Sequence, residues 1–249
     1  MPFLEIKNIS KVFPQGKQRI PALEGVHVTI EEGEFVAVVG PSGCGKSTLL
    51  RLIHGLDKPT QGSILFQGKE NQGLNPDCAM VFQSIGLLPW YTVQENIEIA
   101  LEARGLTEVE IQKRTVRYMD KVGLDGFESA YPRELSGGMK RRVGFCRSLA
   151  VEPQLLLMDE PFSGLDALTA LNLREELLDL WKDPEFPVHT IIMVTHIIEE
   201  AVELADRVLV MGGKPGNIVM DMQVNLPRPR DKRKKEYLEK VDEIFERIV

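Results

Sequence analysis

The sequence predicts an α/β fold with a mainly parallel sheet, an N-terminal antiparallel β segment and an inserted α-helical subdomain. Apolar runs alternate with helical segments, the N-terminal part has short strand patterns broken by glycine turns, and the middle has helical periodicity. Hydrophobic residues make up 43% and charged residues 27% of the 249 residues, which is typical of a globular protein and excludes a disordered or fibrous one.

The strands of the parallel sheet are predicted from runs without polar alternation, because such strands are buried on both faces. These runs are EFVAVVG (34–40), QLLLMD (154–159), TIIMVT (190–195) and RVLVMG (207–212). The antiparallel segment is predicted from shorter strand patterns separated by glycine-containing turns. Its three parts are LEIKNISKVF (4–13), ALEGVHVTIEEGEF (22–35) and GSILFQGK (62–69).

The helical insert is expected at about residues 84–150, within a core domain that covers residues 1–225. Its second helix is predicted to bury a stripe of Val109, Val116, Met119 and Val122. Residues 226–249 form a basic tail that ends in an amphipathic helix. One face of that helix carries Leu238, Val241, Ile244, Phe245 and Ile248. Such a helix either packs on its own domain or a partner, or binds lipid or nucleic acid.

Charge and cysteine content narrow the function classes. The net charge of −7 argues against a nucleic-acid partner, whose usual mark is a basic surface. No apolar run is long enough to span a membrane, and the start of the chain does not resemble a secretory signal. Cys44, Cys78 and Cys146 fit neither a disulfide framework nor a zinc pattern, which favours a reducing cytosol. His27, His54 and His189 have no evident partner for binding a metal, so we expect structural or surface roles for them.

Residues 40–47 match the phosphate-binding pattern GxxxxGKS, placed between a predicted strand and a predicted helix. Glycines let successive backbone N–H groups point at phosphate oxygens, and the start of the helix adds a positive dipole end. We expect Lys46 to reach the β- and γ-phosphates and Ser47 to ligate Mg²⁺. The predicted nucleotide cradle consists of Gly40, Pro41, Ser42, Gly43, Cys44, Gly45, Lys46, Ser47 and Thr48.

Two adjacent carboxylates follow the apolar run 154–158. In a protein with a phosphate-binding loop, Asp159 is placed to hold Mg²⁺ and Glu160 to polarise the attacking water. The alternative is that both acids are simply solvated. The loop, the strand and the acids together predict a P-loop nucleotide-hydrolase core.

The segment Leu135-Ser136-Gly137-Gly138-Met139 precedes a helical pattern and resembles the signature motif of ATP-binding-cassette (ABC) ATPases. Other motifs of this family occur in the family's order. Gln83 resembles the Q-loop residue, Ser163-Gly164-Leu165-Asp166 the D-loop, and His196 the switch histidine, while Phe13 resembles the aromatic residue that stacks on adenine. The family's usual Gln is Met139 here, which leaves any role of that amide in doubt.

The resemblance implies that two copies of the chain pair head to tail and enclose ATP between Lys46 of one and Ser136 of the other. It implies catalytic roles for Glu160, His196, Lys46 and Gln83. Mg²⁺ would be held by Ser47, Gln83 and Asp159, and nucleotide contacts would extend to Phe13, Ser136, Gly137, Gly138 and Asp166.

The stretch around Pro89-Trp90 and LSGGMKRRVGF is most similar to the nitrate/sulfonate/taurine importer branch. That similarity implies a membrane permease that docks near Leu87, Leu88 and Trp90, an indirect solute-binding protein, and a location on the cytoplasmic face of the membrane. Trp90 could instead fill the core of the insert. Two other hypotheses are an ABC ATPase that acts outside membranes, in DNA repair or translation, and a regulator that binds ATP without turnover. The transported substrate is not encoded in this chain.

Overall fold

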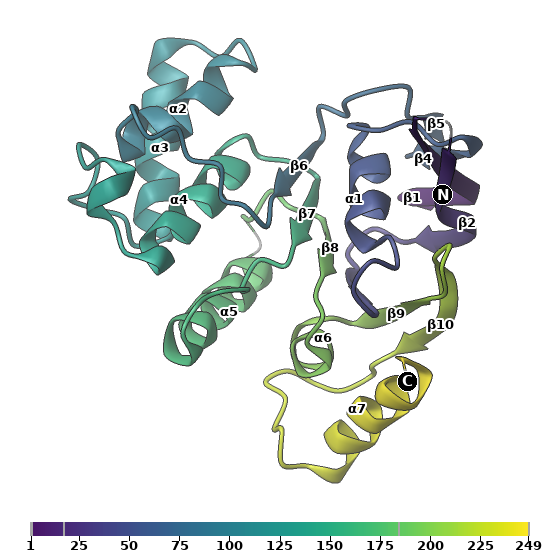
Figure 1. The fold of residues 1–249 in the computed structure, drawn as a ribbon. Helices are drawn as coiled ribbons and strands as arrows, with labels where there is room; N and C mark the ends of the chain where they lie inside the picture. The colour runs from purple at the N-terminus through teal and green to yellow at the C-terminus, as the bar shows by residue number, and fades with distance from the viewer. Residues whose placement is uncertain (1, 17, 184, 249) are drawn as a thin grey trace. The chain divides into compact units, whose positions relative to one another are not determined.

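The structure is a computed structural model that describes residues 2–16, 18–183 and 185–248. The chain divides into two compact units, whose elements are labelled in Figure 1. The first unit contains Met1–Pro76, Leu157–Glu160 and His189–Val249, and the second contains Asp77–Leu156 and Pro161–Val188. The second unit therefore includes the range predicted for the helical insert, and the boundary at residue 225 stays a prediction.

The first unit begins with an antiparallel sheet in the order β2-β1-β4-β5. Leu4, Ile6 and Ile9 point to the buried face of β1, although strict alternation would place residue 9 on the other face. A register shift between Ile6 and Ile9 restores the burial, and Asn8 at this shift has a φ of 48°. The strands are β1 (Leu4–Gln15), β2 (Gln18–Ile30), β4 (Gln61–Phe66) and β5 (Lys69–Glu70).

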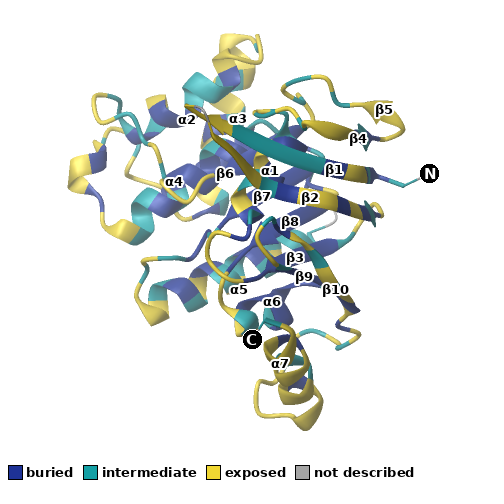
Figure 2. Cartoon of the chain, turned by 45° about the vertical axis from the view of Figure 1, so that its right-hand side comes forward, coloured by how far each residue is buried: buried dark blue, intermediate teal, exposed yellow. Residues whose placement is uncertain are grey.

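A second sheet of the first unit has the order β10-β9-β3-β8-β7. Strand β3 is parallel to both β8 and β9, and β10 closes the edge in antiparallel orientation. Every residue of β3, β7 and β8 is buried, which explains their unbroken apolar sequences (Figure 2). The predicted mixed fold is confirmed, with β3 (Phe35–Val39), β7 (Leu155–Asp159), β8 (Thr190–Val194), β9 (Arg207–Gly212) and β10 (Asn217–Gln223).

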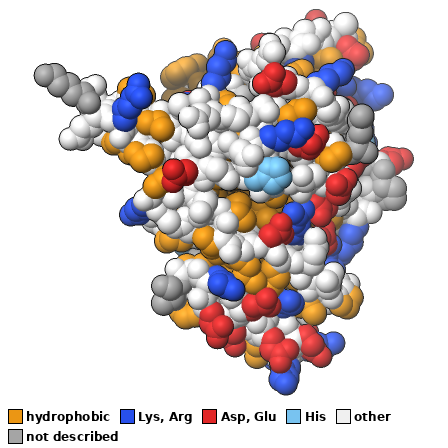
Figure 3. Space-filling model, turned by 90° about the vertical axis from the view of Figure 1, so that its right-hand side faces the viewer, with side chains coloured by type: hydrophobic (Ala, Val, Ile, Leu, Met, Phe, Trp, Pro, Cys, Tyr) orange, Lys and Arg blue, Asp and Glu red, His pale blue; other side chains and the backbone are white. Residues whose placement is uncertain are grey.

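Three helices complete the first unit: α1 (Lys46–His54), α6 (Ile198–Leu204) and α7 (Lys235–Ile248). The tail helix α7 buries Tyr237 and Ile244, and the Tyr237 hydroxyl donates a 2.8 Å hydrogen bond to the carbonyl of Glu199 on α6. Leu238 and Phe245 remain exposed. Acidic and basic side chains are mixed over α7 at the bottom of Figure 3. The helix therefore packs on its own unit and has no uniformly basic face.

The second unit consists of β6 (Cys78–Val81) and the helices α2 (Val93–Glu102), α3 (Glu108–Lys121), α4 (Gly137–Ala150) and α5 (Ala167–Lys182), with a short 3₁₀ turn at Pro132–Glu134. Helices α2 and α3 each begin with a capping box, in which a threonine and a glutamate satisfy each other's backbone N–H groups. Both helices pack against α4.

The predicted stripe on α3 is half wrong. Met119 and Val122 are buried, but Val109 and Val116 are 76% and 60% exposed. The buried face of α3 uses Thr115 and Tyr118 instead, and the Tyr118 hydroxyl donates a 3.2 Å hydrogen bond to the carboxylate of Glu152.

No helix within residues 2–16, 18–183 and 185–248 is long and apolar enough to cross a membrane. Cys44, Cys78 and Cys146 are all buried thiols without a disulfide. Burial raises the pKa of the Cys78 and Cys146 thiols, so both are held as neutral packing groups.

Candidate functional site

The loop between β3 and α1 depends on glycine at two points. A Cβ atom on Gly40 would lie 2.3 Å from the carbonyl oxygen of Met211. Gly45 has a φ of 97°, and a Cβ there would lie 2.6 Å from a methyl group of Leu23. The sequence therefore forces a tight backbone turn that ends at the N-terminus of α1, where the first N–H groups of the helix have no side-chain cap. This turn can bind an anion.

The ammonium group of Lys46, the first residue of α1, lies over this turn. Its Nζ donates hydrogen bonds of 2.7 Å to the carbonyl of Gly40 and 3.0 Å to that of Pro41. The residue is only 6% exposed. A buried cation held by carbonyl dipoles is well placed to interact with phosphate oxygens.

The hydroxyl of Ser47 donates a 3.0 Å hydrogen bond to Oδ1 of Asp159, at the end of β7. Burial raises the pKa of the Asp159 carboxyl, and the Ser47 hydrogen bond partly opposes that rise. The two side chains bring together the hydroxyl of an exposed serine and an oxygen of a buried carboxylate. This donor set fits Mg²⁺, a hard cation that takes oxygen ligands.

Glu160 and His196 follow two adjacent strands, β7 and β8. Oε2 of Glu160 lies 3.3 Å from Nδ1 of His196. Glu160 has a φ of 47°, an uncommon backbone conformation for a non-glycine residue, and its N–H donates to the carbonyl of Val194. The hydrogen bond to Val194 thus holds the backbone of Glu160 in this uncommon conformation, in which its carboxylate faces the histidine.

The turn that carries His196 is held by two buried side chains that the sequence analysis missed. The hydroxyl of Thr195 donates a 2.7 Å hydrogen bond to the carboxylate of Glu200 and accepts one of 3.1 Å from the N–H of Ile197. Both Thr195 and Glu200 are almost fully buried. The signal in the sequence is a Glu placed five residues after a Thr at the strand end, but this spacing alone does not distinguish it from a solvated acid.

Phe13 lies near the end of β1, where it is half-buried and pairs across the hairpin with Ile20. The ammonium of Lys11 lies 4.8 Å from the centre of its ring. The ring therefore has one face in contact with a cation, and it is accessible enough to stack on a planar ligand.

The remaining predicted residues lie in the second unit. Ser136 caps α4, and its hydroxyl accepts a 3.2 Å hydrogen bond from the N–H of Met139. Only the backbone of Met139 takes part in this cap. A Cβ on Gly138 would lie 2.6 Å from the Thr169 side chain, so this position is confined to glycine. Gln83 follows β6 in an irregular, exposed segment.

Asp166 caps α5 by accepting a 3.0 Å hydrogen bond from the N–H of Thr169. Hydrogen bonds from the Thr169 hydroxyl and from its N–H lower the pKa of the Asp166 carboxyl. The predicted site residues thus fall into two groups. The loop 40–48, Asp159, Glu160, His196 and Phe13 belong to the first unit, and Gln83, Ser136, Gly137, Gly138 and Asp166 to the second.

Comparison with known proteins shows the family to which the chain belongs. The model of the ABC transporter family matches residues 23–163. The nitrate import ATP-binding protein NrtD of Synechocystis is 45% identical over 97% of this chain and 93% of its own. The aliphatic sulfonates import ATP-binding protein SsuB of Bacillus cereus is 41% identical over 98% of this chain and 96% of its own.

A solved structure, the dimeric post-hydrolysis state of the ATP-binding cassette MJ0796 bound to ADP and Pi, superposes with a TM-score of 0.78. It is 32% identical and covers 90% of this chain and all of its own. A P-loop, a strand-end acid pair and a signature helix on this fold define an ATP-hydrolysing cassette. The chain belongs to the ABC transporter family, and it is an ATPase that powers transport. The resemblance drawn from the sequence is confirmed, and the alternative of an ATPase that acts outside membranes is not supported.

Proposed function

We propose that the chain is the Mg²⁺-dependent ATPase subunit of an importer for a small oxyanion, of the nitrate or sulfonate kind. One observation carries the ATPase part: Ser47, Asp159, Glu160 and His196 gather beside the phosphate-binding turn. The anion class is supported by the two relatives, since one is named for nitrate import and the other for aliphatic sulfonates.

In the proposed reaction, the N–H groups of loop 40–48 and the ammonium of Lys46 bind the phosphates. Lys46 leaves the carbonyls of Gly40 and Pro41 for the β- and γ-phosphate oxygens. Ser47, Asp159 and Gln83 would hold Mg²⁺, which when bound would supply positive charge beside the transferring group. Phe13 stacks on adenine.

Hydrolysis transfers the γ-phosphoryl group to water. Glu160 orients and polarises that water, and His196, next to the Glu160 carboxylate, contacts the γ-phosphate. The transition state is loose and carries its charge on the phosphoryl oxygens, so positioned donors provide most of the catalysis.

We propose that two copies pair head to tail. Ser136 and the N–H groups of Gly137 and Gly138 then complete the phosphate site of the other copy, with Asp166 at the same interface. Support comes from the first turn of α4, which carries no acidic residue, and from the dimeric state of the solved cassette. ATP between two such surfaces acts as a linkage that favours the dimer.

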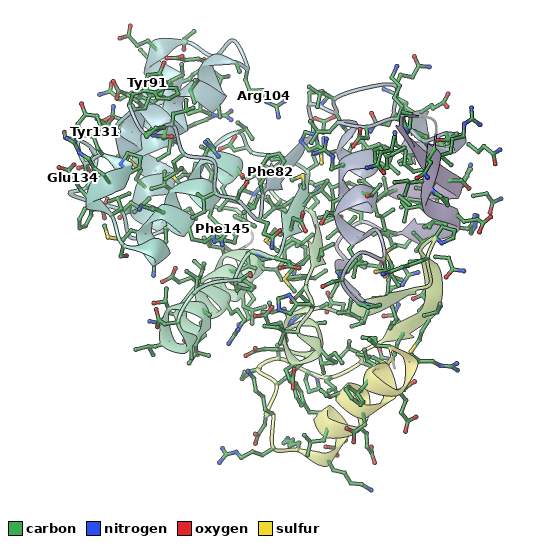
Figure 4. The ribbon with its side chains drawn as sticks, in the orientation of Figure 1. Phe82, Tyr91, Arg104, Tyr131, Glu134 and Phe145 are labelled. Carbon is green, nitrogen blue, oxygen red and sulfur yellow. The ribbon has the colours of Figure 1, made fainter. Side chains whose placement is uncertain are left out.

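The permease is proposed to dock at Leu87, Leu88 and Trp90. Trp90 is 66% exposed and makes an edge-to-face contact with Tyr91, which Figure 4 labels. The interpretation of Trp90 as a core residue of the insert is therefore wrong. An exposed indole on a fixed loop is the kind of side chain that anchors a partner helix.

The docking loop is fixed by Asn96 of α2, which is fully buried. Its amide donates to the carbonyls of Leu88, Tyr91 and Thr92, and its oxygen accepts from the N–H of Leu88. Docking there would place the chain on the cytoplasmic face of the membrane. The permease would link it to a periplasmic or extracellular solute-binding protein, and no nucleic acid is involved.

The proposal is tested by uptake of labelled nitrate and of labelled alkanesulfonates into cells that express the chain from its own locus. Replacement by Lys46→Ala is expected to abolish uptake of one of these anions. Retention of all anion uptake, with a stably expressed variant, would contradict the anion importer.

A further inference from the structure

The guanidinium group of Arg141 connects three motifs within the second unit. Arg141 lies on α4, five residues after Ser136. Its Nη1 donates to the carbonyl of Gln83 at 2.8 Å and to that of Phe82 at 3.4 Å. From Nη2 it donates to the carbonyl of Ser163 at 2.8 Å. The helix that begins at the signature motif is thus bonded to the segment of Gln83 and to the loop that leads to Asp166. Figure 4 labels Phe82 after β6 and Phe145 on the same helix.

The charge of Arg141 is buried without an acid. The residue is 5% exposed, and in the part of the chain that the structure describes no carboxylate lies within ion-pair distance of it. Burial alone lowers the pKa of its guanidinium. A buried cation is a poor way to gain stability, and an apolar side chain of the same volume would fill the space better. We therefore infer that Arg141 matters because its Nη1 and Nη2 atoms are placed to donate hydrogen bonds to two separate segments.

The same face of α4 holds the rest of the Gln83 segment. Arg147 donates to the carbonyls of Ile85 and Gly86, at 2.8 and 3.0 Å. The Ser148 hydroxyl donates to the carbonyl of Met80, and a Cβ on Gly144 would lie 3.1 Å from a methyl group of Ile85. Positions 141, 144, 147 and 148 share one side of a helix. These contacts reach residues 80, 82, 83, 85 and 86, and Arg141 also bonds to Ser163.

We propose that Arg141 is a positioning residue, which makes the Gln83 segment, the signature helix α4 and the loop 163–166 move as one body during ATP turnover. A planar guanidinium can donate to two loops at once from separate nitrogens, whereas a lysine ammonium has one donor atom. The inference rests on the roles proposed above for Gln83, Ser136 and Asp166.

The test compares Arg141→Lys and Arg141→Met with a matched control at Glu176, the ion-pair partner of the neighbouring Arg142. Arg142 makes a bidentate ion pair with Glu176, at 2.6 Å for each bond, and donates to the carbonyl of Val122. These bonds reach neither the Gln83 segment nor the loop 163–166. Glu176→Gln therefore removes a strong arginine contact from the same helix. We expect both Arg141 variants to lower kcat at least tenfold with the KM for ATP within twofold, and Glu176→Gln to leave both within twofold.

A second measurement covers the case in which Arg141→Met fails to fold. Amide hydrogen exchange is followed in peptides that contain residues 82–86 and 163–166. In Arg141→Lys we expect faster exchange in both peptides, and in Glu176→Gln in neither. A wild-type kcat for Arg141→Lys, or faster exchange in one peptide only, would overturn the proposal. Normal turnover of Glu160→Gln would instead refute the proposed catalytic site, so the two failures are distinguishable.

Discussion

The hydroxyl of Ser47 lies 3.0 Å from the carboxylate of Asp159, although 112 positions separate the two residues. Ser47 is the second residue of α1 and Asp159 the last of β7, so the phosphate-binding turn and the acid pair are held in one unit. The hydrogen bond fixes both oxygens before any ligand binds, which reduces the ordering that metal binding would require.

Asp159→Asn should stabilise the chain without ligand and remove its response to Mg²⁺. Burial raises the pKa of the Asp159 carboxyl above the value of about 3.9 in an unfolded chain. The folded state therefore binds the proton more tightly, and the free energy of unfolding falls as the pH rises between these two pKa values. At pH 7, in the absence of metal, the buried charge of Asp159 therefore lowers the free energy of unfolding.

Thermal unfolding at pH 7 measures this effect. We expect the midpoint without ligand to rise by about 2–4 °C in Asp159→Asn, which corresponds to about 1 kcal/mol for a chain of this size. Added MgATP should then stabilise the variant no more than ATP with EDTA does. An equal Mg²⁺-dependent rise in variant and wild type would contradict the metal assignment.

Thr195→Val should damage the turn that carries His196. The variant removes the donor to the buried Glu200 carboxylate and the acceptor of the Ile197 N–H. We expect the free energy of unfolding to fall by about 1–3 kcal/mol in urea, with reduced turnover. His196→Ala is the matched contrast: the His196 side chain is half-exposed, so stability should stay within about 0.5 kcal/mol while turnover is lost. A stability loss in His196→Ala equal to that in Thr195→Val would contradict this division.

Arg230→Met should detach the tail from α6. Nη1 of Arg230 donates to the carbonyls of Val202 and Ala205 at the end of α6, and the side chain is 2% exposed. Loss of this cap leaves buried carbonyls unsatisfied, so we expect destabilisation by about 2–4 kcal/mol in urea unfolding. Lys232→Ala breaks only an exposed pair with Glu203 and should change stability by less than about 1 kcal/mol. Similar losses in the two variants would argue against the capping role.

Trp90→Ala should keep ATP hydrolysis in solution and lose assembly with the permease. The indole is exposed on a loop that Asn96 fixes through the backbone, so its removal should leave the fold intact. Val109→Ala is the control, because Val109 is also strongly exposed in the second unit. Co-purification of the membrane subunit with each variant measures the effect. Unchanged assembly of Trp90→Ala would contradict the docking site.

The sequence predicted the parts of this molecule whose chemistry is local. The loop 40–47 was recognisable because its glycines, lysine and serine act through adjacent backbone, and the runs in β3, β7 and β8 because burial on both faces leaves no polar positions. Helix α5 was not anticipated, because its many leucines do not separate into a clear stripe and only Ala170, Leu173 and Leu177 are buried. Its start depends on the Asp166 cap. Strand β10 was missed because this edge strand is short and alternates exposed with partly buried residues, so that only Met222 is fully buried.

Contacts between segments that are distant in the chain could not be predicted from the sequence. Nothing near Arg141 indicates that its acceptors are carbonyls at positions 82, 83 and 163, because backbone acceptors leave no mark in the side-chain pattern. The exposure of Val109 and Val116 could not be predicted for a related reason. Helical periodicity predicts that a face exists but not which face the neighbouring helices cover.

The role of Glu160 as the residue that activates water is the central claim, and Glu160→Gln tests it most directly. The amide keeps the shape of the side chain beside His196 but cannot accept the proton. Steady-state phosphate release should fall by about 100-fold or more, while ATP binding persists and ATP-dependent dimers accumulate in light scattering. Phosphate release at the wild-type rate, without trapped dimers, would contradict the account.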